Sequence, residues 1–287
     1  MIDVVLIFNG LGNQMSQYAF YLAKKKQSAL TIPVYFDNEG LSHNGYELNR
    51  IFDIDIKSDN HLHSFFRNWY IKYLQKGKVF FATKSFCHII SERVDYSYED
   101  SMLKENPLGI NYYWGGWHSE KYFSEIENDI RKLYAFNEKK INEHSLKWAK
   151  IIRESRSSCS IHVRRGDYLA HPYFNGIATE AYYKKAIETL LRMRNEQEFF
   201  VFSDDIQWCR SLWGDNHFHY IDCNIKNDSW QDMYLMSICQ NHINANSTFS
   251  WWGAWLSSSK DSVTIVPNRF TSMCETPDFY PEKWIKL

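Results

Sequence analysis

Short apolar segments alternate with helical segments from residue 159 to residue 266, and this alternation constrains the fold more than any other feature. The segments expected to be strands are Cys159–Val163, Glu198–Phe202, Phe218–Ile221, His242–Ala245 and Val263–Val266. The segments expected to be helices are Glu180–Met193, Asp205–Trp213, Ser229–Cys239 and Ser247–Leu256. Strands that alternate with single helices form a parallel sheet covered on both faces. The second half of the chain therefore predicts a doubly wound α/β domain.

A strand–helix–strand unit opens the chain and predicts a second α/β domain. Residues 4–8 form an apolar strand, and Asn13 is expected to cap a helix that ends near Gln27. Thr31–Phe36 is expected to be the next strand. Pro33 favours a position at the sheet edge, because proline cannot donate a ladder hydrogen bond.

The stretch between residues 40 and 150 has a weaker pattern, rich in aromatic side chains, His and Asn. The expected elements there are helices over residues 60–75 and 138–154 and a loop over Leu108–Trp117. A polar run near residue 155 separates this stretch from the regular second half. The two expected domains are residues 1–155 and residues 156–287.

Composition narrows the class of protein. The 287 residues carry a net charge of −1, which disfavours nucleic acid as a partner because no overall attraction to phosphate exists. The six cysteines form no CxxC pair, so we expect reduced thiols without a zinc site. No leader peptide and no apolar run of about 18 residues is visible. We therefore expect a cytoplasmic protein with at most a peripheral membrane association.

An arginine pair, Arg164 and Arg165, follows the first strand of the regular half. Such a pair alone is typical of a solvated surface. Here it stands where a strand ends, and guanidinium groups match phosphate oxygens in shape and charge. Neighbouring side chains at a strand end diverge, so one arginine is expected to reach the ligand and the other to pair with Asp167 or with a second phosphate oxygen. His162 is expected either to bond a base edge or to pack between layers.

Ser203, Asp204 and Asp205 follow the next strand along the chain. An acidic pair at this place is one way to hold a metal ion. It is also the usual chemistry of a helix N-terminus, where a carboxylate caps the backbone and complements the dipole. With two arginines available to neutralise an anion, we favour capping or ribose contacts and expect no metal.

Hydroxyl and amide side chains follow a third strand, at Asn246, Ser247, Thr248 and Ser250. One hydroxyl is enough to cap the next helix, and the others are available to a phosphate. Because the carboxyl ends of parallel strands share one edge, these three strand ends are expected to meet. Their combined chemistry suits a nucleoside diphosphate.

Two further places are candidates for the same ligand. Asp228 and Asp232 flank the start of a helix, where they either bind a nucleotide base or complement the helix dipole. Near the N-terminus, the glycine turn contains Gly10, Gly12, Asn13 and Gln14. It lacks the third glycine of a dinucleotide fingerprint, so a nicotinamide or flavin site is disfavoured against a tight β–α turn.

Four ordered motifs make the chain resemble the bacterial alpha-1,2-fucosyltransferases, which use GDP-fucose. The motifs are Gly10–Ala19, His162–Tyr168, Phe202–Asp205 and Asn244–Gly253. The resemblance implies a GT-B fold of two facing Rossmann-like, doubly wound domains, with the acceptor on the N-terminal one and GDP-fucose on the C-terminal one. It also implies inversion at the anomeric carbon, no metal or other cofactor, and a role in surface polysaccharide synthesis.

The resemblance suggests a role for each candidate residue in moving L-fucose to the 2-hydroxyl of a terminal β-galactoside. Arg165 or Arg164, helped by Ser247 and Thr248, would stabilise the leaving phosphate. His162 with Asp228 or Asp232 would contact guanine. Asn13 and Gln14 would reach the sugar or phosphate from the first domain, and Asp167 is a candidate base or only orients an arginine. The alternatives are a non-catalytic binder of nucleotide sugars or glycans, and a fucosyltransferase of another linkage.

Overall fold

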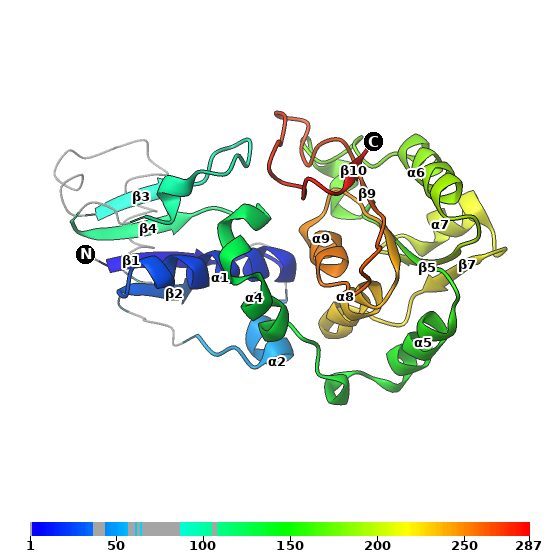
Figure 1. The fold of residues 1–287 in the computed structure, drawn as a ribbon, viewed down its shortest axis with the longest axis horizontal. Helices are drawn as coiled ribbons and strands as arrows, with labels where there is room; N and C mark the ends of the chain where they lie inside the picture. Colours follow the sequence, from blue (N-terminus) through cyan, green and yellow to red (C-terminus); the bar gives the residue numbers. More distant parts are fainter. Residues whose placement is uncertain (1, 37–43, 57–60, 62–63, 65–86, 105–107) are drawn as a thin grey trace. The chain divides into compact units, whose positions relative to one another are not determined.

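The computed structural model describes residues 2–36, 44–56, 61, 64, 87–104 and 108–287 (Figure 1). The chain divides into two compact units, Met1–Ala135 and Phe136–Leu287. Within the described ranges, no helix has the length and apolar character needed to cross a membrane. Most of the helix expected over residues 60–75 lies outside the described residues.

The second unit begins about 20 residues before the predicted boundary, because α5 (Glu143–Glu154) packs against α8 (Trp230–Ser237). The side chain of Asn142 caps α5 by accepting from the backbone N–H of Ser145. The backbone N–H of Asn142 in turn donates to Gln231 Oε1 at 2.9 Å. The polar run near residue 155 is therefore a turn inside this unit.

The first unit contains a parallel four-stranded sheet in the order β2-β1-β4-β3. The strands are β1 (Ile2–Ile7), β2 (Thr31–Tyr35), β3 (Cys87–Ser91) and β4 (Ile110–Trp114). The helices are α1 (Leu11–Gln27), α2 (Leu48–Phe52) and α4 (Glu127–Leu133), with 3-10 turns η2 (Asp100–Met102) and η3 (Glu120–Ile126). Pro33 lies on the edge strand β2, as predicted.

Two expectations for this unit are wrong. The predicted loop at 108–117 contains β4, an inner strand whose Tyr112 and Tyr113 are both buried. Glycines on both sides and the polar Asn111 conceal the strand in the sequence, but Asn111 Nδ2 donates to Asp3 Oδ1 at 2.9 Å inside the core. Asn13 does not cap α1, since the N-cap position belongs to Gly10 and no side chain caps it.

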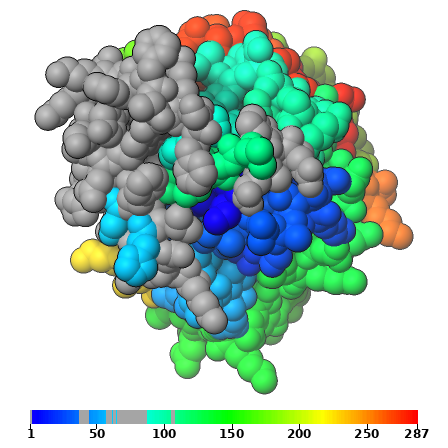
Figure 2. Space-filling view, turned by 90° about the vertical axis from the view of Figure 1, so that its left-hand side faces the viewer, coloured from blue at the N-terminus to red at the C-terminus, as the bar shows by residue number. Residues whose placement is uncertain are grey.

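A buried ion pair fastens α1 to the sheet. Lys24 Nζ lies 3.3 Å from Asp3 Oδ2, and both side chains are fully buried. The same ammonium donates to the carbonyl oxygens of Met102 and Lys104. In Figure 2 the blue surface of the α1 region accordingly lies beside the teal surface of residues near 100. Lys24 thus holds the helix, the first strand and the η2 segment together.

The second unit contains a parallel six-stranded sheet in the order β10-β9-β8-β5-β6-β7. The strands are β5 (Ser158–Val163), β6 (Glu198–Ser203), β7 (Phe218–Ile221), β8 (Asn241–Ile243), β9 (Thr264–Val266) and β10 (Ile285–Lys286). The helices besides α5 and α8 are α6 (Glu180–Met193), α7 (Ile206–Trp213) and α9 (Thr248–Trp255). Short 3-10 turns are η4 (Glu138–Lys140), η5 (Asp167–Ala170) and η6 (Lys226–Asp228). The predicted strands and helices of the regular half are confirmed.

Candidate functional site

Three neighbouring strands of the second sheet end at the same edge. β5 lies between β6 and β8, and all three run parallel. The residues that follow them are therefore brought together, as the sequence predicts. This edge of the sheet, formed by residues 164–168, 203–205 and 244–250, is called the arginine edge below.

Arg165 is held on three sides at this edge. Its Nε donates to Asp205 Oδ2 at 2.9 Å, and its guanidinium lies 4.0 Å from the centre of the Trp208 ring. Its backbone N–H donates to Asp204 Oδ1 at 2.8 Å. The plane of the guanidinium is thereby fixed, while no hydrogen bond of its Nη groups is found among the described residues.

Arg164 points to different partners, as expected for adjacent side chains at a strand end. Its Nη2 lies 2.7 Å from Asp167 Oδ1, and its Nη1 lies 3.2 Å from Asp204 Oδ2. Asp167 is thus committed to an ion pair, which matches its interpretation as a residue that orients an arginine. A Cβ at Gly166 would lie 2.9 Å from Asp204 Oδ2, so a larger residue in this turn would press on the carboxylate that pairs with Arg164.

Asp204 and Asp205, which follow β6, pair with the two arginines, and Asp205 also caps α7. Asp205 caps α7 by accepting from the backbone N–H of Trp208 at 3.1 Å. Ser203 Oγ accepts from the backbone N–H of Asp205 at 2.9 Å. The hydrogen bond from Arg165 holds the pKa of Asp205 below its ordinary value. In the parts of the chain that the structure describes, no group of three His, Cys, Asp or Glu residues could hold a metal ion.

The residues after β8 divide into two kinds. Asn246 and Ser250 are buried and bonded to the backbone, since Asn246 Nδ2 donates to Phe270 O at 3.0 Å and Ser250 Oγ donates to Ser247 O at 3.3 Å. Ser247 caps α9 by accepting from the backbone N–H of Phe249. Thr248 begins the helix and stays partly exposed. Thr248 and the first turn of α9 are therefore the groups most accessible to an anion, while the capping Ser247 is buried.

His162 lies beneath the arginines and beside Phe249, with ring centroids 5.8 Å apart. Burial, followed by the charge of Arg164, lowers its pKa to about 3, so the ring is neutral at any working pH. Its Nδ1 is buried and has no hydrogen-bond partner within the described residues. A ligand group that donates or accepts a hydrogen bond could satisfy this nitrogen.

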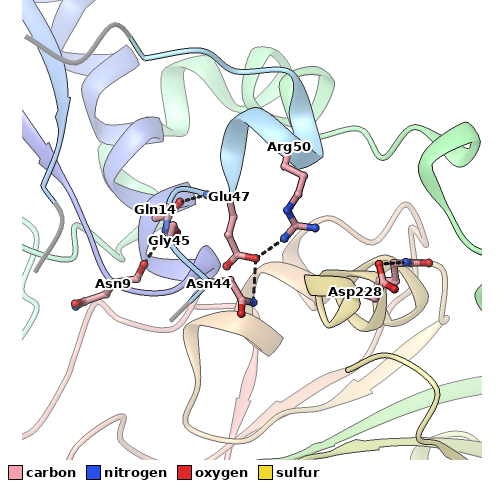
Figure 3. A network of polar contacts seen from close by, with 8 residues as sticks. Asn9, Gln14, Asn44, Gly45, Glu47, Arg50 and Asp228 are labelled. Carbon is pink, nitrogen blue, oxygen red and sulfur yellow. Dashed lines mark hydrogen bonds and ion pairs between the residues drawn. The ribbon is translucent and has the colours of Figure 1, made fainter. Parts of the chain in front are cut away.

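Two carboxylates follow β7, the strand next to β6. Asp232 accepts from Asn224 Nδ2 at 2.8 Å, and burial raises its pKa to about 7. Asp228, labelled in Figure 3, accepts from Gln231 Nε2 at 3.1 Å. Both contacts lie in a polar network at the start of α8, and neither carboxylate has a cationic partner among the described residues. A ligand with N–H donors would suit them.

Gln14 does not have the role predicted for it. Its side chain is fully buried, donates to the carbonyl oxygens of Asn9 at 2.7 Å and Gly45 at 2.8 Å, and accepts from the backbone N–H of Glu47 at 2.9 Å (Figure 3). All of its hydrogen-bonding groups brace the β1–α1 turn, so none is free to reach a ligand. Gly10 and Gly12 shape the same turn, and Asn13 alone of the four keeps a partly exposed side chain that could meet one.

A second cluster of polar contacts, not expected from the sequence, lies in the first unit. Gln17 accepts from the backbone N–H of Phe8 at 2.8 Å and donates to Gly115 O at 3.0 Å, linking the ends of β1 and β4. Glu92, directly after β3, accepts from the backbone N–H groups of Gly116 and Trp117. The adjacent glycines after an aromatic run were the signal that could have pointed to a tight, specified turn here.

A profile of the family described as "Glycosyl transferase family 11" matches residues 2–287. The chain belongs to glycosyl transferase family 11. The resemblance to the alpha-1,2-fucosyltransferases is therefore confirmed at the level of the family.

Relatives of this family 11 chain include glycosyltransferases from bacteria and primates. An alpha-1,2-colitosyltransferase from Escherichia coli is 32% identical over 298 residues, covering 100% of this chain and 99% of the relative. The O-antigen biosynthesis glycosyltransferase WbnK of Escherichia coli is 37% identical over 144 residues, covering 49% and 48%. A galactoside alpha-(1,2)-fucosyltransferase 1 from Saimiri sciureus is 24% identical over 184 residues, covering 58% and 49%.

Solved structures support the fold. The structure of NodZ alpha-1,6-fucosyltransferase soaked with GDP-fucose has a TM-score of 0.53 at 12% identity, covering 89% of this chain and 92% of NodZ. A variant of Arabidopsis thaliana FUT1 in complex with GDP has a TM-score of 0.51 at 13% identity, covering 98% and 75%. The predicted α/β fold of GT-B type is confirmed.

Proposed function

We propose that this family 11 enzyme transfers L-fucose from GDP-β-L-fucose to the 2-hydroxyl of a terminal β-galactoside, with inversion at the anomeric carbon. The observation that carries the proposal is the meeting of three strand ends at the arginine edge. Cationic, hydroxyl and backbone N–H groups gather there without a metal-ligand cluster among the described residues. That chemistry suits a nucleoside diphosphate as leaving group.

The site must stabilise the negative charge that develops on the leaving phosphate. As the C1–O bond of the donor breaks, negative charge collects on the β-phosphate. Arg165 presents its Nη groups in a fixed plane, and the hydroxyls of the partly exposed Thr248 and the buried Ser247 lie at the start of α9. Groups oriented in advance in this way stabilise developing charge without reorganisation. Arg164, paired with Asp167, would contact the second phosphate.

The nucleoside would extend from the arginine edge toward β7. Guanine offers two N–H donors on one edge, which a carboxylate accepts as a pair. Asp228 and Asp232 are the candidates for this contact, and Asp232 would be charged once guanine is bound because its hydrogen bonds favour the carboxylate. The buried Nδ1 of His162 is a second contact for the donor. The first unit would hold the acceptor, with Asn13 at the mouth of its sheet.

GDP-colitose is a second candidate donor, because a relative that aligns with the whole chain is a colitosyltransferase. Colitose lacks the 3-hydroxyl of fucose, so the two donors share every diphosphate and guanine contact. The likeness to WbnK also favours a product that belongs to a surface polysaccharide. The protein would then act on the cytoplasmic side, on acceptors that end in galactose.

A competition assay separates the two donors and tests the metal requirement. The chain is incubated with lactose and with equal amounts of GDP-fucose and GDP-colitose, with and without EDTA, and products are resolved by mass. We expect the fucosylated product to dominate and its yield to be unaffected by EDTA. Dominant colitosyl product would assign the other donor. Tight GDP binding without either product would favour the non-catalytic alternative.

A further inference from the structure

Asp228 and Asp232, the two carboxylates proposed to contact guanine, are each held by a buried amide. Gln231 Nε2 donates to Asp228 Oδ1 at 3.1 Å, and Asn224 Nδ2 donates to Asp232 Oδ1 at 2.8 Å. Gln231 and Asn224 are only 1% and 8% exposed. The orientation of both amides is therefore set by their protein neighbours and not by solvent.

A backbone group fixes the direction of the Gln231 amide. The backbone N–H of Asn142 donates to Gln231 Oε1 at 2.9 Å. Because a backbone N–H can only donate, the amide oxygen has to face α5 and Nε2 has to face Asp228. An amide turned by 180° would set two N–H groups against each other and would leave Asp228 Oδ1 facing an oxygen. The hydrogen bond to Asp228 therefore has one possible direction.

The same helix orients the Asn224 amide through one more residue. The backbone N–H of Ser145 donates to Asn142 Oδ1 at 2.8 Å, which leaves Asn142 Nδ2 to donate to Asn224 Oδ1 at 3.3 Å. Ser145 Oγ donates to the same oxygen at 3.0 Å. Asn224 Nδ2 is thus the end that faces Asp232. These four residues, Asn142, Ser145, Asn224 and Gln231, are called the amide network below.

The amide network makes each carboxylate an acceptor and favours its ionised form. Burial raises the pKa of Asp232 to about 7, and the hydrogen bond from Asn224 opposes this rise. The positive end of the α5 dipole lies where the network begins and acts in the same sense as the amide donors. A ligand that meets the remaining carboxylate oxygens needs N–H donors. Guanine has two of these on one edge, whereas adenine has a bare ring nitrogen there, which a carboxylate repels.

We propose that Asn224 and Gln231 set the base specificity of the donor site, by holding Asp232 and Asp228 as acceptors for the N–H groups of guanine. The inference rests on the proposed function, which assigns guanine to these carboxylates. Asn224 and Gln231 are positioning residues, since both ends of each amide are already bonded within the protein. The amide network and both carboxylates belong to the second unit, so the arrangement is complete within it.

The test uses Gln231→Glu and Asn224→Asp, which keep the shape of each side chain and the oxygen that faces α5. Each variant replaces the N–H donor with a second carboxylate oxygen, so the partner carboxylate loses a hydrogen bond and meets a like charge. Binding of GDP and of ADP is measured by isothermal titration calorimetry at pH 8, above the pKa of about 7 of Asp232. We expect the ratio of GDP affinity to ADP affinity to fall about 10-fold in each variant.

Gln240→Glu is the matched control, because it makes the same change at an exposed residue beyond the other end of α8. It should keep the wild-type ratio of affinities. A role confined to fastening α5 to α8 predicts a lower Tm with an unchanged ratio in both variants, and that result would overturn the proposal. Where Gln231→Glu does not fold, Asn224→Asp decides by the same ratio.

The wild-type chain separates this inference from the proposed function. A wild type that binds GDP no more tightly than ADP refutes the proposed donor, and the inference fails with it. A wild type that prefers GDP, together with folded variants that keep the full preference, refutes this inference alone.

Discussion

At the scale of single residues, Arg164 and Arg165 are adjacent in sequence but have different surroundings. Arg165 is clamped between Asp205 and Trp208, whereas Arg164 bridges Asp167 and Asp204. A clamped guanidinium presents its remaining N–H groups in a fixed direction, which a flexible ammonium cannot reproduce. The two arginines should therefore respond differently to substitution.

Arg165→Ala should lower kcat by about 100- to 1,000-fold, because one oriented donor to the leaving phosphate is lost. Arg165→Lys should recover little of this activity. The matched control is Arg210→Ala, since Arg210 also pairs with an aspartate and lies over an aromatic ring, 4.3 Å from the centre of Tyr220. Steady-state kinetics and thermal unfolding of the three variants provide the check. Equal losses at positions 165 and 210 would contradict a specific role for the arginine edge.

Asp232 makes stability depend on pH in a defined direction. Burial raises its pKa from 3.8 to about 7, so the folded protein binds a proton more tightly than the unfolded chain. This contribution to stability is fully present below pH 4 and is lost as the pH rises through 7. Relative to Asp232→Asn, the wild type should lose up to about 1.4 kcal/mol per pH unit between pH 4 and pH 7 in denaturant unfolding. A difference between the two proteins that does not change with pH would exclude this explanation.

At the scale of helices and strands, polar side chains buried in the first unit act as fasteners. Lys24 and Asp3 form a fully buried pair, and Lys24 also donates to two carbonyl groups of the η2 segment. Removing one member of such a pair leaves an uncompensated charge in the core. The intact ion pair therefore stabilises the packing of α1 on its sheet.

Lys24→Met should destabilise the protein by about 3–5 kcal/mol, since Asp3 is left buried without its cation. Lys26→Met is the control on the same helix, because Lys26 faces Asp129 at 3.7 Å with both side chains more than half exposed. An exposed pair contributes roughly 0–1 kcal/mol. Urea unfolding followed by circular dichroism measures both. A similar small loss of unfolding free energy at both positions would show that the buried pair does not stabilise the packing of α1.

The elements that sequence predicts well are those with a strong period. β7 and α6 have the predicted bounds, because apolar residues recur at strand and helix spacing between clear turn residues. β4 was missed because Asn111 and the flanking glycines break the apolar pattern, and the sequence does not reveal that Asn111 donates to its tertiary partner Asp3 in the core. The domain boundary was missed for a similar reason, since only packing assigns α5 to α8.

The candidate site likewise has a part that could be predicted from the sequence and a part that could not. Parallel topology brings the ends of β5, β6 and β8 together whatever the side chains do, so the arginine edge could be predicted from strand order alone. The role of Gln14 could not, because its rotamer turns the amide into the β1–α1 turn. The contacts of Glu92 were likewise hidden, since the backbone N–H groups that bind it come from the turn after β4, 24 and 25 residues away in sequence.

At the scale of the whole molecule, one chain carries two parallel sheets, and each presents chemically distinct groups at its carboxyl edge. The second unit gathers cations and hydroxyls that suit a diphosphate, while the first unit holds the buried carboxyl of Glu92, whose Oε1 has no hydrogen-bond partner within the described ranges. A leaving group and a proton have to be handled at the same time in a glycosyl transfer. The proposed mechanism assigns the leaving group to the arginine edge of the second unit.

The most direct test of the central claim is the product formed from GDP-fucose and lactose without added metal. The linkage is read by NMR of the purified trisaccharide, with GDP release followed in parallel. The account predicts one fucose joined by an α-1,2 bond to galactose and one GDP released for each bond formed. Release of GDP without trisaccharide, or fucose attached through another hydroxyl, would contradict it.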